Sequence, residues 1–293
     1  MIVVCNKPGQ LGNRLIVFAS LIAIAKEYSL TIINPSFDEY ADYFEGSQNL
    51  IVKYPRTESI ARGKFGKTFR RLLFNFSYYA FAVIIRIGVK GRFLKTIALE
   101  GEEELDIEES YILMKSQKKL VLLNGWKFRG NNLLKKNKSE IIKYFTPEKF
   151  YSQRIDAYVQ KLEKVDYSIL VGIHIRRGDY FTFENGIYYY SDNQYLDQMK
   201  RIQHLFKNEK IHFILFSNES LNLDFFNKED ISAQLGPGFE LDDMYILSKC
   251  HFIAGPPSTY TMWASFYGEK PLYMIKNLDN LFELKDFRII DEF

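Results

Sequence analysis

Residues able to bind an anionic ligand directly follow an apolar stretch in the second half of the chain. His174, Arg176, Arg177 and Asp179 lie in HIRRGDY, after the run ILVG. Arginine is always charged, and its planar guanidinium suits phosphate oxygens. Because neighbouring residues of a strand face opposite ways, the two arginines should serve different purposes. We expect one to reach a diphosphate and the other to pair with a carboxylate, with Asp179 as a candidate. The alternative is a strand end carrying a structural ion pair.

Two further polar clusters follow apolar runs in the same way. SNES, which contains Ser217 and Asn218, follows HFILF, and GPPSTYT, which contains Ser258, Thr259 and Tyr260, follows HFIA. Ser258 and Thr259 come after a rigid Pro-Pro turn at the expected start of a helix, where free N–H groups and the helix dipole favour an anion. The alternatives are a plain loop for the first cluster and an ordinary capped helix for the second.

Short apolar runs and helical patterns alternate through this half of the chain. YSILVGIHI, KIHFILFS, CHFIAG and KPLYMI read as strands, and DNQYLDQMKRIQHLF, LDDMYILSKC and STYTMWASFYG lie between them as helices. Such alternation predicts right-handed crossovers and a parallel sheet. Ligands of open parallel sheets bind beyond the carboxyl ends of the strands. The three polar clusters should therefore meet at one ligand.

The first half of the chain also begins as an α/β unit. The run IVVC predicts a strand, NKPGQLGN a turn, and RLIVFASLIAIAKEY a largely buried helix. A length of 293 residues suits two domains. We predict an α/β protein with an N-terminal domain over 1–160 and a C-terminal domain over 161–293.

Composition and the absence of certain motifs argue against several classes of function. A net charge of +3 does not indicate a nucleic-acid-binding protein. The two cysteines lack a pairing motif, the four histidines lack metal-binding spacing, and the start of the chain lacks a signal-peptide pattern, which together predict a cytoplasmic protein without a metal site. The sequence contains neither an Asp-x-Asp pair nor a P-loop motif, so arginines would have to neutralise a bound diphosphate.

Residues 62–95 form an aromatic, apolar segment with basic ends. Polar interruptions make it a poor transmembrane span. It is either an interfacial helix that touches anionic lipid at the inner face of a bacterial plasma membrane, or a buried helix or helical pair with solvated ends. In the first case a ligand of the protein could be a lipid-linked oligosaccharide.

Three blocks of the chain resemble a known family. HIRRGDY resembles the His-x-Arg-Arg-x-Asp-Tyr motif of α-1,2-fucosyltransferases (glycosyltransferase family 11) and the related motifs of α-1,6- and protein O-fucosyltransferases. PGQLGNRLIVFAS resembles their Gly-x-x-Gly-Asn segment, with Arg14 in place of the usual Gln, and LDDMYILSKCHFIAGPPSTYTMWASFYG resembles their third block.

The resemblance implies a GT-B glycosyltransferase, with two Rossmann-like domains facing a cleft, that transfers fucose from GDP-fucose to a glycan hydroxyl with inversion and without a metal or other cofactor. The C-terminal domain would bind the donor and the N-terminal domain the acceptor. Arg176 would contact the donor β-phosphate, His174 and Asp243 would lie near the guanosine, and Ser258 and Thr259 would bind the diphosphate. Gly12 and Asn13 would lie near the transferred sugar.

The general base is the hardest residue to assign. Glu184, in DYFTFENG, is the candidate, and a solvated loop residue is the alternative reading. Three functions stay open at this point. They are a fucosyltransferase of surface polysaccharide synthesis with α-1,2 linkage, a transferase of the same scaffold with another nucleotide sugar, and a non-catalytic carbohydrate-binding relative.

Overall fold

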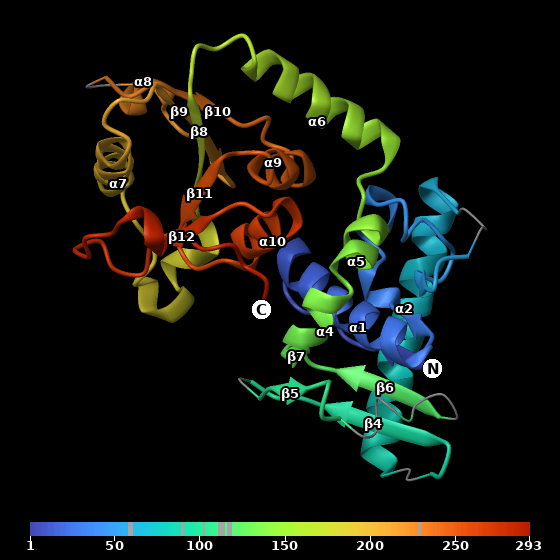
Figure 1. The fold of residues 1–293 in the computed structure, drawn as a ribbon. Helices are drawn as coiled ribbons and strands as arrows, with labels where there is room; N and C mark the ends of the chain where they lie inside the picture. The colour runs from blue at the N-terminus through green and yellow to red at the C-terminus, as the bar shows by residue number, and fades with distance from the viewer. Residues whose placement is uncertain (58–60, 89–90, 102, 111–114, 116–118, 228–229) are drawn as a thin grey trace. The chain divides into compact units, whose positions relative to one another are not determined.

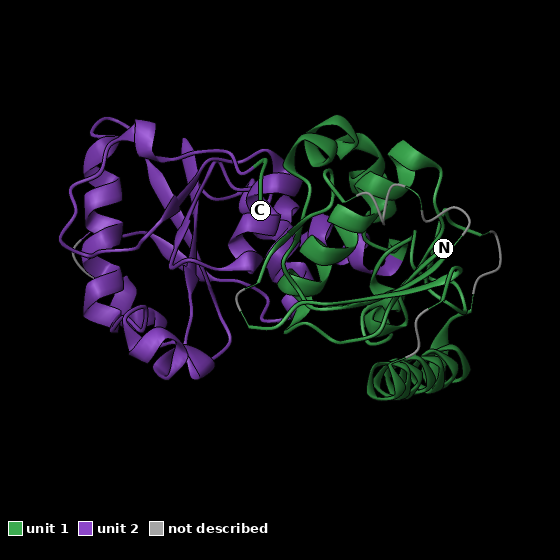
Figure 2. Cartoon of the chain, turned by 90° about the horizontal axis from the view of Figure 1, so that it is seen from below, with its two compact units in different colours: residues 1–149, 291–293 green, residues 150–290 purple. Residues whose placement is uncertain are grey.

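The computed structural model divides into two compact units, each of which contains a mainly parallel β-sheet (Figures 1 and 2). Unit 1 comprises Met1–Lys149 and Asp291–Phe293, and unit 2 comprises Phe150–Ile290. The boundary expected between residues 160 and 161 falls inside helix α6 (Lys149–Leu162). The structure describes residues 1–57, 61–88, 91–101, 103–110, 115, 119–227 and 230–293.

The sheet of unit 1 has the strand order β3-β2-β1-β6-β4. Every neighbouring pair is parallel except β2 and β3. A second, two-stranded sheet pairs β5 with β7. The strands of this unit are β1 (Ile2–Val4), β2 (Ile32–Ile33), β3 (Lys53–Tyr54), β4 (Leu94–Ala98), β5 (Leu105–Asp106), β6 (Leu120–Asn124) and β7 (Phe128–Arg129).

Helix α1 (Leu11–Tyr28) follows β1 and is buried along most of its length, which confirms the strand, turn and helix predicted for the start of the chain. Helices α4 (Asn131–Lys136) and α5 (Lys138–Tyr144) contact α1. Helix α2 (Gly63–Ile87) lies at the side of unit 1, and only four of its residues are buried. Among the described residues of this unit, the short helical turns are η1 (Pro35–Phe37) and η2 (Ala41–Tyr43).

The sheet of unit 2 has the strand order β10-β9-β8-β11-β12, and all of its strands are parallel. This confirms the parallel sheet predicted from the alternating apolar runs. The strands are β8 (Ile169–Ile175), β9 (Ile211–Ser217), β10 (Ala233–Leu235), β11 (Phe252–Gly255) and β12 (Leu272–Met274). Strand β10 was not expected from the sequence.

Helices cover both faces of this sheet (Figure 1). Side chains of α7 (Asp192–Leu205), including Met199 and Ile202, pack with Ile173 and other residues of β8 and β9 in one core. On the other face, Gly172 lets α9 (Glu240–Leu247) approach, because a Cβ there would lie 2.3 Å from Leu247 Cδ1. The remaining helical elements are η4 (Gly178–Phe181), η5 (Phe183–Gly186), α8 (Leu223–Phe226), α10 (Thr259–Gly268) and η6 (Leu284–Asp286).

Candidate functional site

The three predicted polar clusters lie at the same edge of the unit 2 sheet. Strand β8 lies between β9 and β11, and all three run in the same direction. The residues after their carboxyl ends are therefore neighbours, as the sequence predicted.

His174 lies near the end of β8 on the face covered by α9 and α10. Its side chain is only 4% exposed, and its ring stacks on Tyr260 of α10 with the ring centres 4.9 Å apart. Burial, reinforced by the charge of Arg176, lowers the pKa of His174 from 6.5 to about 3. The imidazole is therefore neutral at pH 7. Its buried Nδ1 has no hydrogen-bond partner among the described residues.

Arg176 lies on the same face of β8 as His174. Its Nη2 is 2.8 Å from the carboxylate of Asp179, and its guanidinium lies 5.2 Å from the centre of the Tyr180 ring. The backbone N–H of Arg176 donates to the hydroxyl of Tyr195, a residue of α7 that no sequence motif indicated. Asp179 is more than half exposed, so the ion pair lies at the surface end of the site.

Arg177 takes the other face, as the alternation along a strand requires. It is buried and donates hydrogen bonds to the Tyr190 carbonyl and to the carboxylate of Asp192, the first residue of α7. Its backbone N–H donates to Asn218 Oδ1 at 3.0 Å. Arg177 therefore joins the end of β8 to the start of α7 and to the loop after β9.

The start of α10 forms a capped helix N-terminus close to these residues. The Ser258 hydroxyl accepts a hydrogen bond from the Tyr260 N–H at 3.2 Å, and Thr259 is the first residue of the helix. The Tyr180 hydroxyl donates to the carbonyl of Pro257. Tyr180 therefore contacts the guanidinium of Arg176 with its ring and the turn before α10 with its hydroxyl.

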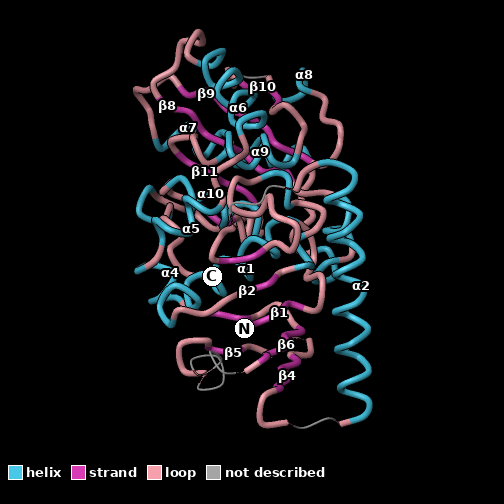
Figure 3. Tube along the Cα trace, turned by 90° about the vertical axis from the view of Figure 1, so that its right-hand side faces the viewer, coloured by secondary structure: helices cyan, strands magenta, loops and turns pink. Residues whose placement is uncertain are grey.

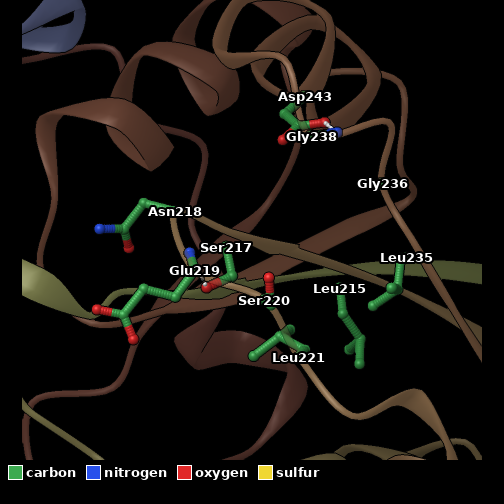
Figure 4. A pocket seen from close by; sticks show the side chains of 10 residues that line it. All are labelled: Leu215, Ser217, Asn218, Glu219, Ser220, Leu221, Leu235, Gly236, Gly238 and Asp243. Carbon is green, nitrogen blue, oxygen red and sulfur yellow. Dashed lines mark hydrogen bonds between the residues drawn. The ribbon is translucent and has the colours of Figure 1, made fainter.

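A pocket of about 410 Å³ opens beside this edge of the sheet (Figure 4). Three of the predicted residues, Ser217, Asn218 and Asp243, contribute to its walls. The sequence analysis did not select the other residues that line the pocket. Two signals could have indicated some of them: Glu219 belongs to the SNES cluster, and LGPG, after β10, contains two glycines. The other lining residues are Leu215, Glu219, Ser220, Leu221, Leu235, Gly236 and Gly238.

Asp243 is the buried acid of this pocket. Its Oδ1 accepts a hydrogen bond from the Gly238 N–H at 2.9 Å. Burial, which outweighs this hydrogen bond and is aided by the charge of Asp242, raises the pKa of Asp243 from 3.8 to about 7. Gly236 borders the carboxylate closely, because a Cβ there would lie 3.0 Å from Asp243 Oδ1.

The pocket and the HIRRGDY segment share hydrogen bonds. Asn218 accepts from the backbone of Arg177, and Glu219 Oε1 accepts from the N–H of Gly178 at 3.1 Å. Gly178 has a φ of +60°, which favours glycine. The loop after β9 therefore fixes the turn that follows the two arginines.

The remaining predicted residues lie elsewhere. Glu184 is exposed in η5, and its φ of 47° places it in the left-handed region. Gly12 and Asn13 belong to the first turn of α1 in unit 1. A Cβ on Gly9 would lie 2.3 Å from Asn13 Nδ2, so a glycine at that position makes room for the Asn13 side chain.

The fold and this edge define a class of protein. Two units with mainly parallel sheets, the second carrying arginines and a helix N-terminus at the carboxyl ends of its strands, match the GT-B glycosyltransferase architecture. The chain belongs to glycosyl transferase family 11, whose model matches residues 118–286, more than half of its length. No curated protein sequence gave a significant match.

Solved fucosyltransferase structures share the fold across nearly the whole chain. A mutant of Arabidopsis thaliana FUT1 in complex with GDP has a TM-score of 0.56 at 15% identity, and the match covers 94% of this chain and 70% of that one. Fucosyltransferase NodZ from Bradyrhizobium has a TM-score of 0.56 at 14% identity, with 96% and 97% covered. POFUT1 in complex with GDP-fucose has a TM-score of 0.53 at 12% identity, with 92% and 94% covered.

Proposed function

We propose that this glycosyltransferase moves fucose from GDP-fucose to a hydroxyl of a glycan acceptor, with inversion at the anomeric carbon and without a metal ion. The observation that carries the proposal is the junction of Arg176, Tyr180 and the N-terminus of α10 at the carboxyl edge of the unit 2 sheet. GDP or GDP-fucose accompanies two of the similar structures. We further propose α-1,2 linkage and a role in surface polysaccharide synthesis, on the strength of the family.

Arg176 and the N-terminus of α10 supply the charge that the reaction needs. As the acceptor oxygen bonds to the anomeric carbon, the bond from that carbon to the β-phosphate oxygen breaks, and its electron pair leaves with GDP. Negative charge grows on the diphosphate during this step. A guanidinium and free helix N–H groups placed beforehand stabilise that charge more in the transition state than in the ground state. Ser258 and Thr259 would hold the diphosphate at this helix end.

The pocket beside the arginines is our candidate for the binding site of the nucleoside. Its polar side chains, among them Ser217, Asn218 and Asp243, offer the hydrogen bonds that a purine base and a ribose require. Neutral His174 would line the same region with its ring held by Tyr260. Arg177 and Asp179 would act by holding the turn that follows the two arginines, since the side chain of each already pairs with another residue of the protein.

Unit 1 would bind the acceptor, with Gly12 and Asn13 near the transferred sugar. The proton of the attacking hydroxyl must go to a base, for which we propose Glu184, an exposed carboxylate in the segment after HIRRGDY. If the transition state is oxocarbenium-like and the bond to the leaving group is already largely broken, the attacking hydroxyl needs less help from this base.

We propose that the reaction takes place in the cytoplasm, at the inner face of a bacterial plasma membrane, and that the acceptor is lipid-linked. Within the part of the chain that the structure describes, each helix is too short or too polar to cross a membrane. The contact with the bilayer that we propose is peripheral.

A donor panel tests the proposed function. Release of free nucleotide is measured with GDP-fucose, GDP-mannose, UDP-galactose and CMP-sialic acid, each with EDTA in excess. We expect hydrolysis or transfer with GDP-fucose alone, and a thermal shift with GDP but not with UDP, ADP or CMP. Turnover of another donor would favour a transferase with a changed sugar. The absence of any nucleotide response would favour a non-catalytic carbohydrate-binding protein.

A further inference from the structure

Helix α2 presents a long apolar stripe that the protein leaves exposed. The side chain of Phe65 is 75% exposed, that of Leu72 62% and that of Phe76 73%. The stripe recurs at alternating spacings of four and three residues, so it follows one side of the helix over almost its whole length. Its members are Phe65, Phe69, Leu72, Phe76, Tyr79 and Val83.

A different side of α2 fixes the helix to unit 1. Arg70 is fully buried, with its Nη2 2.6 Å from the carboxylate of Asp42 and its Nη1 2.7 Å from the Ala61 carbonyl. Phe81 packs against Cys5 and Leu122 in the small core next to the sheet. Figure 3 shows α2 running alongside the strands of unit 1. Because other residues make the packing contacts, the exposed stripe does not serve the core of this unit.

The charges around the stripe are of one sign. Residues 63–95 contain no aspartate or glutamate. Lys64, Lys67 and Arg71 near the start of α2, and Arg86 near its end, are exposed and make no ion pair with another described residue. An apolar stripe with these cations at both ends of its helix complements a surface that has an anionic outer layer and an apolar interior.

We propose that α2 lies in the surface plane of an anionic bilayer, with the stripe in the acyl boundary and the basic side chains at the lipid headgroups. Phe and Tyr suit this boundary because their rings are apolar or amphipathic, and lysine and arginine stems extend along apolar surface while their charges reach the headgroups. Charge complementarity selects the anionic lipid, and the stripe selects a bilayer over a soluble anion.

A second copy of the chain is the competing occupant, and the residues beside the stripe disfavour it. If the stripe formed the seam of a coiled coil, the flanking positions that choose a partner would carry Thr68, Leu73, Asn75, Ala80 and Ala82. None of them is charged. Two such helices would also bring cations together without an acidic residue to pair with them.

Vesicle flotation at low salt tests the proposal. The full chain is mixed with vesicles of phosphatidylcholine alone or of phosphatidylcholine with 40% phosphatidylglycerol, at about 20 and about 500 mM NaCl. We expect flotation with the anionic vesicles at low salt, and little with the neutral vesicles or at high salt. Absence of flotation under all four conditions would overturn the proposal.

Two variants separate the contributions of the stripe and the charges. L72S/F76S should lower the partition coefficient on anionic vesicles by roughly tenfold or more. K64Q/K67Q/R71Q should lower it by roughly 100-fold at low salt, since each cation near an anionic surface contributes on the order of fivefold. Exposed positions of this kind tolerate substitution, and far-UV circular dichroism with a thermal melt checks the fold of each variant.

Matched controls come from unit 2. L281S removes an apolar side chain that is 91% exposed, and K164Q/K207Q/K276Q removes three exposed lysines. Both should float like the wild type. If the controls lose as much binding as the α2 variants, α2 is not the contact. If L72S/F76S converts a concentration-dependent dimer to a monomer in sedimentation velocity while flotation is unchanged, the stripe is a dimer seam and the proposal fails. Neither readout requires turnover, so a failed donor assay would not affect this result.

Discussion

Arg176 and Arg177 are adjacent in the chain but hold different carboxylates on opposite faces of β8. Arg176 pairs with Asp179, three residues on, at the exposed end of the site. Arg177 is buried and pairs with Asp192, the first residue of α7. The two side chains therefore differ in what their removal should change: Arg176 should affect the reaction, and Arg177 the stability of the fold.

Replacing Arg176 by alanine should abolish most turnover and leave the protein folded. A single preorganised donor of this kind contributes about 3–4 kcal/mol to the barrier, which corresponds to a loss of two to three orders of magnitude in kcat. Its ion-pair partner Asp179 is largely exposed and can be solvated by water. Initial rates with GDP-fucose and a glycan acceptor measure the effect, and a thermal melt measures the fold. A variant that keeps more than about a tenth of the wild-type rate would contradict the assigned role.

Replacing Arg177 by alanine should destabilise unit 2 instead. The substitution leaves the Tyr190 carbonyl and the Asp192 carboxylate without their buried donor, and it removes a guanidinium that packs on the rings of Tyr189 and Tyr195. We expect the free energy of unfolding to fall by about 1–3 kcal/mol. Urea denaturation followed by fluorescence measures it. An Arg177→Ala protein as stable as the wild type, but inactive, would instead place Arg177 at the donor.

The sequence was sufficient to predict the strands that carry the site, because a strand buried on both faces reads as an unbroken apolar run. It also predicted that the two arginines would separate, since alternation along a strand is a local property. It could not identify Asp192 as the partner of Arg177, because only the folding of the segment between them brings α7 back to the end of β8. The closer carboxylate in sequence, Asp179, pairs with the other arginine.

Strand β10 and the exposed stripe of α2 could not be predicted from the sequence either. Residues Ala233–Leu235 are too few, and too polar at Gln234, to give a strand signal, so the pocket wall after β10 was missed. For residues 62–95, composition alone fits a buried or an interfacial helix. The exposed stripe became visible only when the packing face of α2 was known. The hydrogen bonds that Arg14 donates to the carbonyls of Gly9 and Ser36 were also not predictable, because they depend on the fold.

The raised pKa of Asp243 predicts a pH dependence of stability. A carboxyl whose pKa is about 7 when folded and 3.8 when unfolded binds more protons in the native state between these values. Its contribution to stability is therefore lost as the pH rises from about 4 to about 7. His174, whose pKa is lowered by burial, contributes in the opposite direction over a similar range. The two effects partly cancel in the wild type.

Asp243→Asn should reveal this cancellation. Without the carboxyl, the variant should become more stable relative to the wild type as the pH rises, and the difference in the free energy of unfolding should change by about 3 kcal/mol between pH 4 and pH 7. Urea denaturation of both proteins across this range gives the difference directly, and the other titrating groups are common to both. If the difference between the two proteins is independent of pH, Asp243 ionises as an ordinary carboxylate in the native state, which would contradict its raised pKa.

Replacing Gly236 by alanine should close the proposed nucleoside pocket without touching the arginines. A Cβ at this position would lie 2.5 Å from the Phe216 ring and 3.0 Å from Asp243 Oδ1, so one of these side chains must move into the pocket or away from its present contact. Because ligand binding stabilises the folded state in proportion to the logarithm of affinity, the thermal shift produced by GDP should shrink. The matched control is Gly91→Ala in unit 1, where a Cβ meets nothing closer than Leu94 at 3.7 Å. If Gly236→Ala keeps the full GDP shift while Arg176→Ala loses it, the base is bound outside this pocket and only the diphosphate assignment survives.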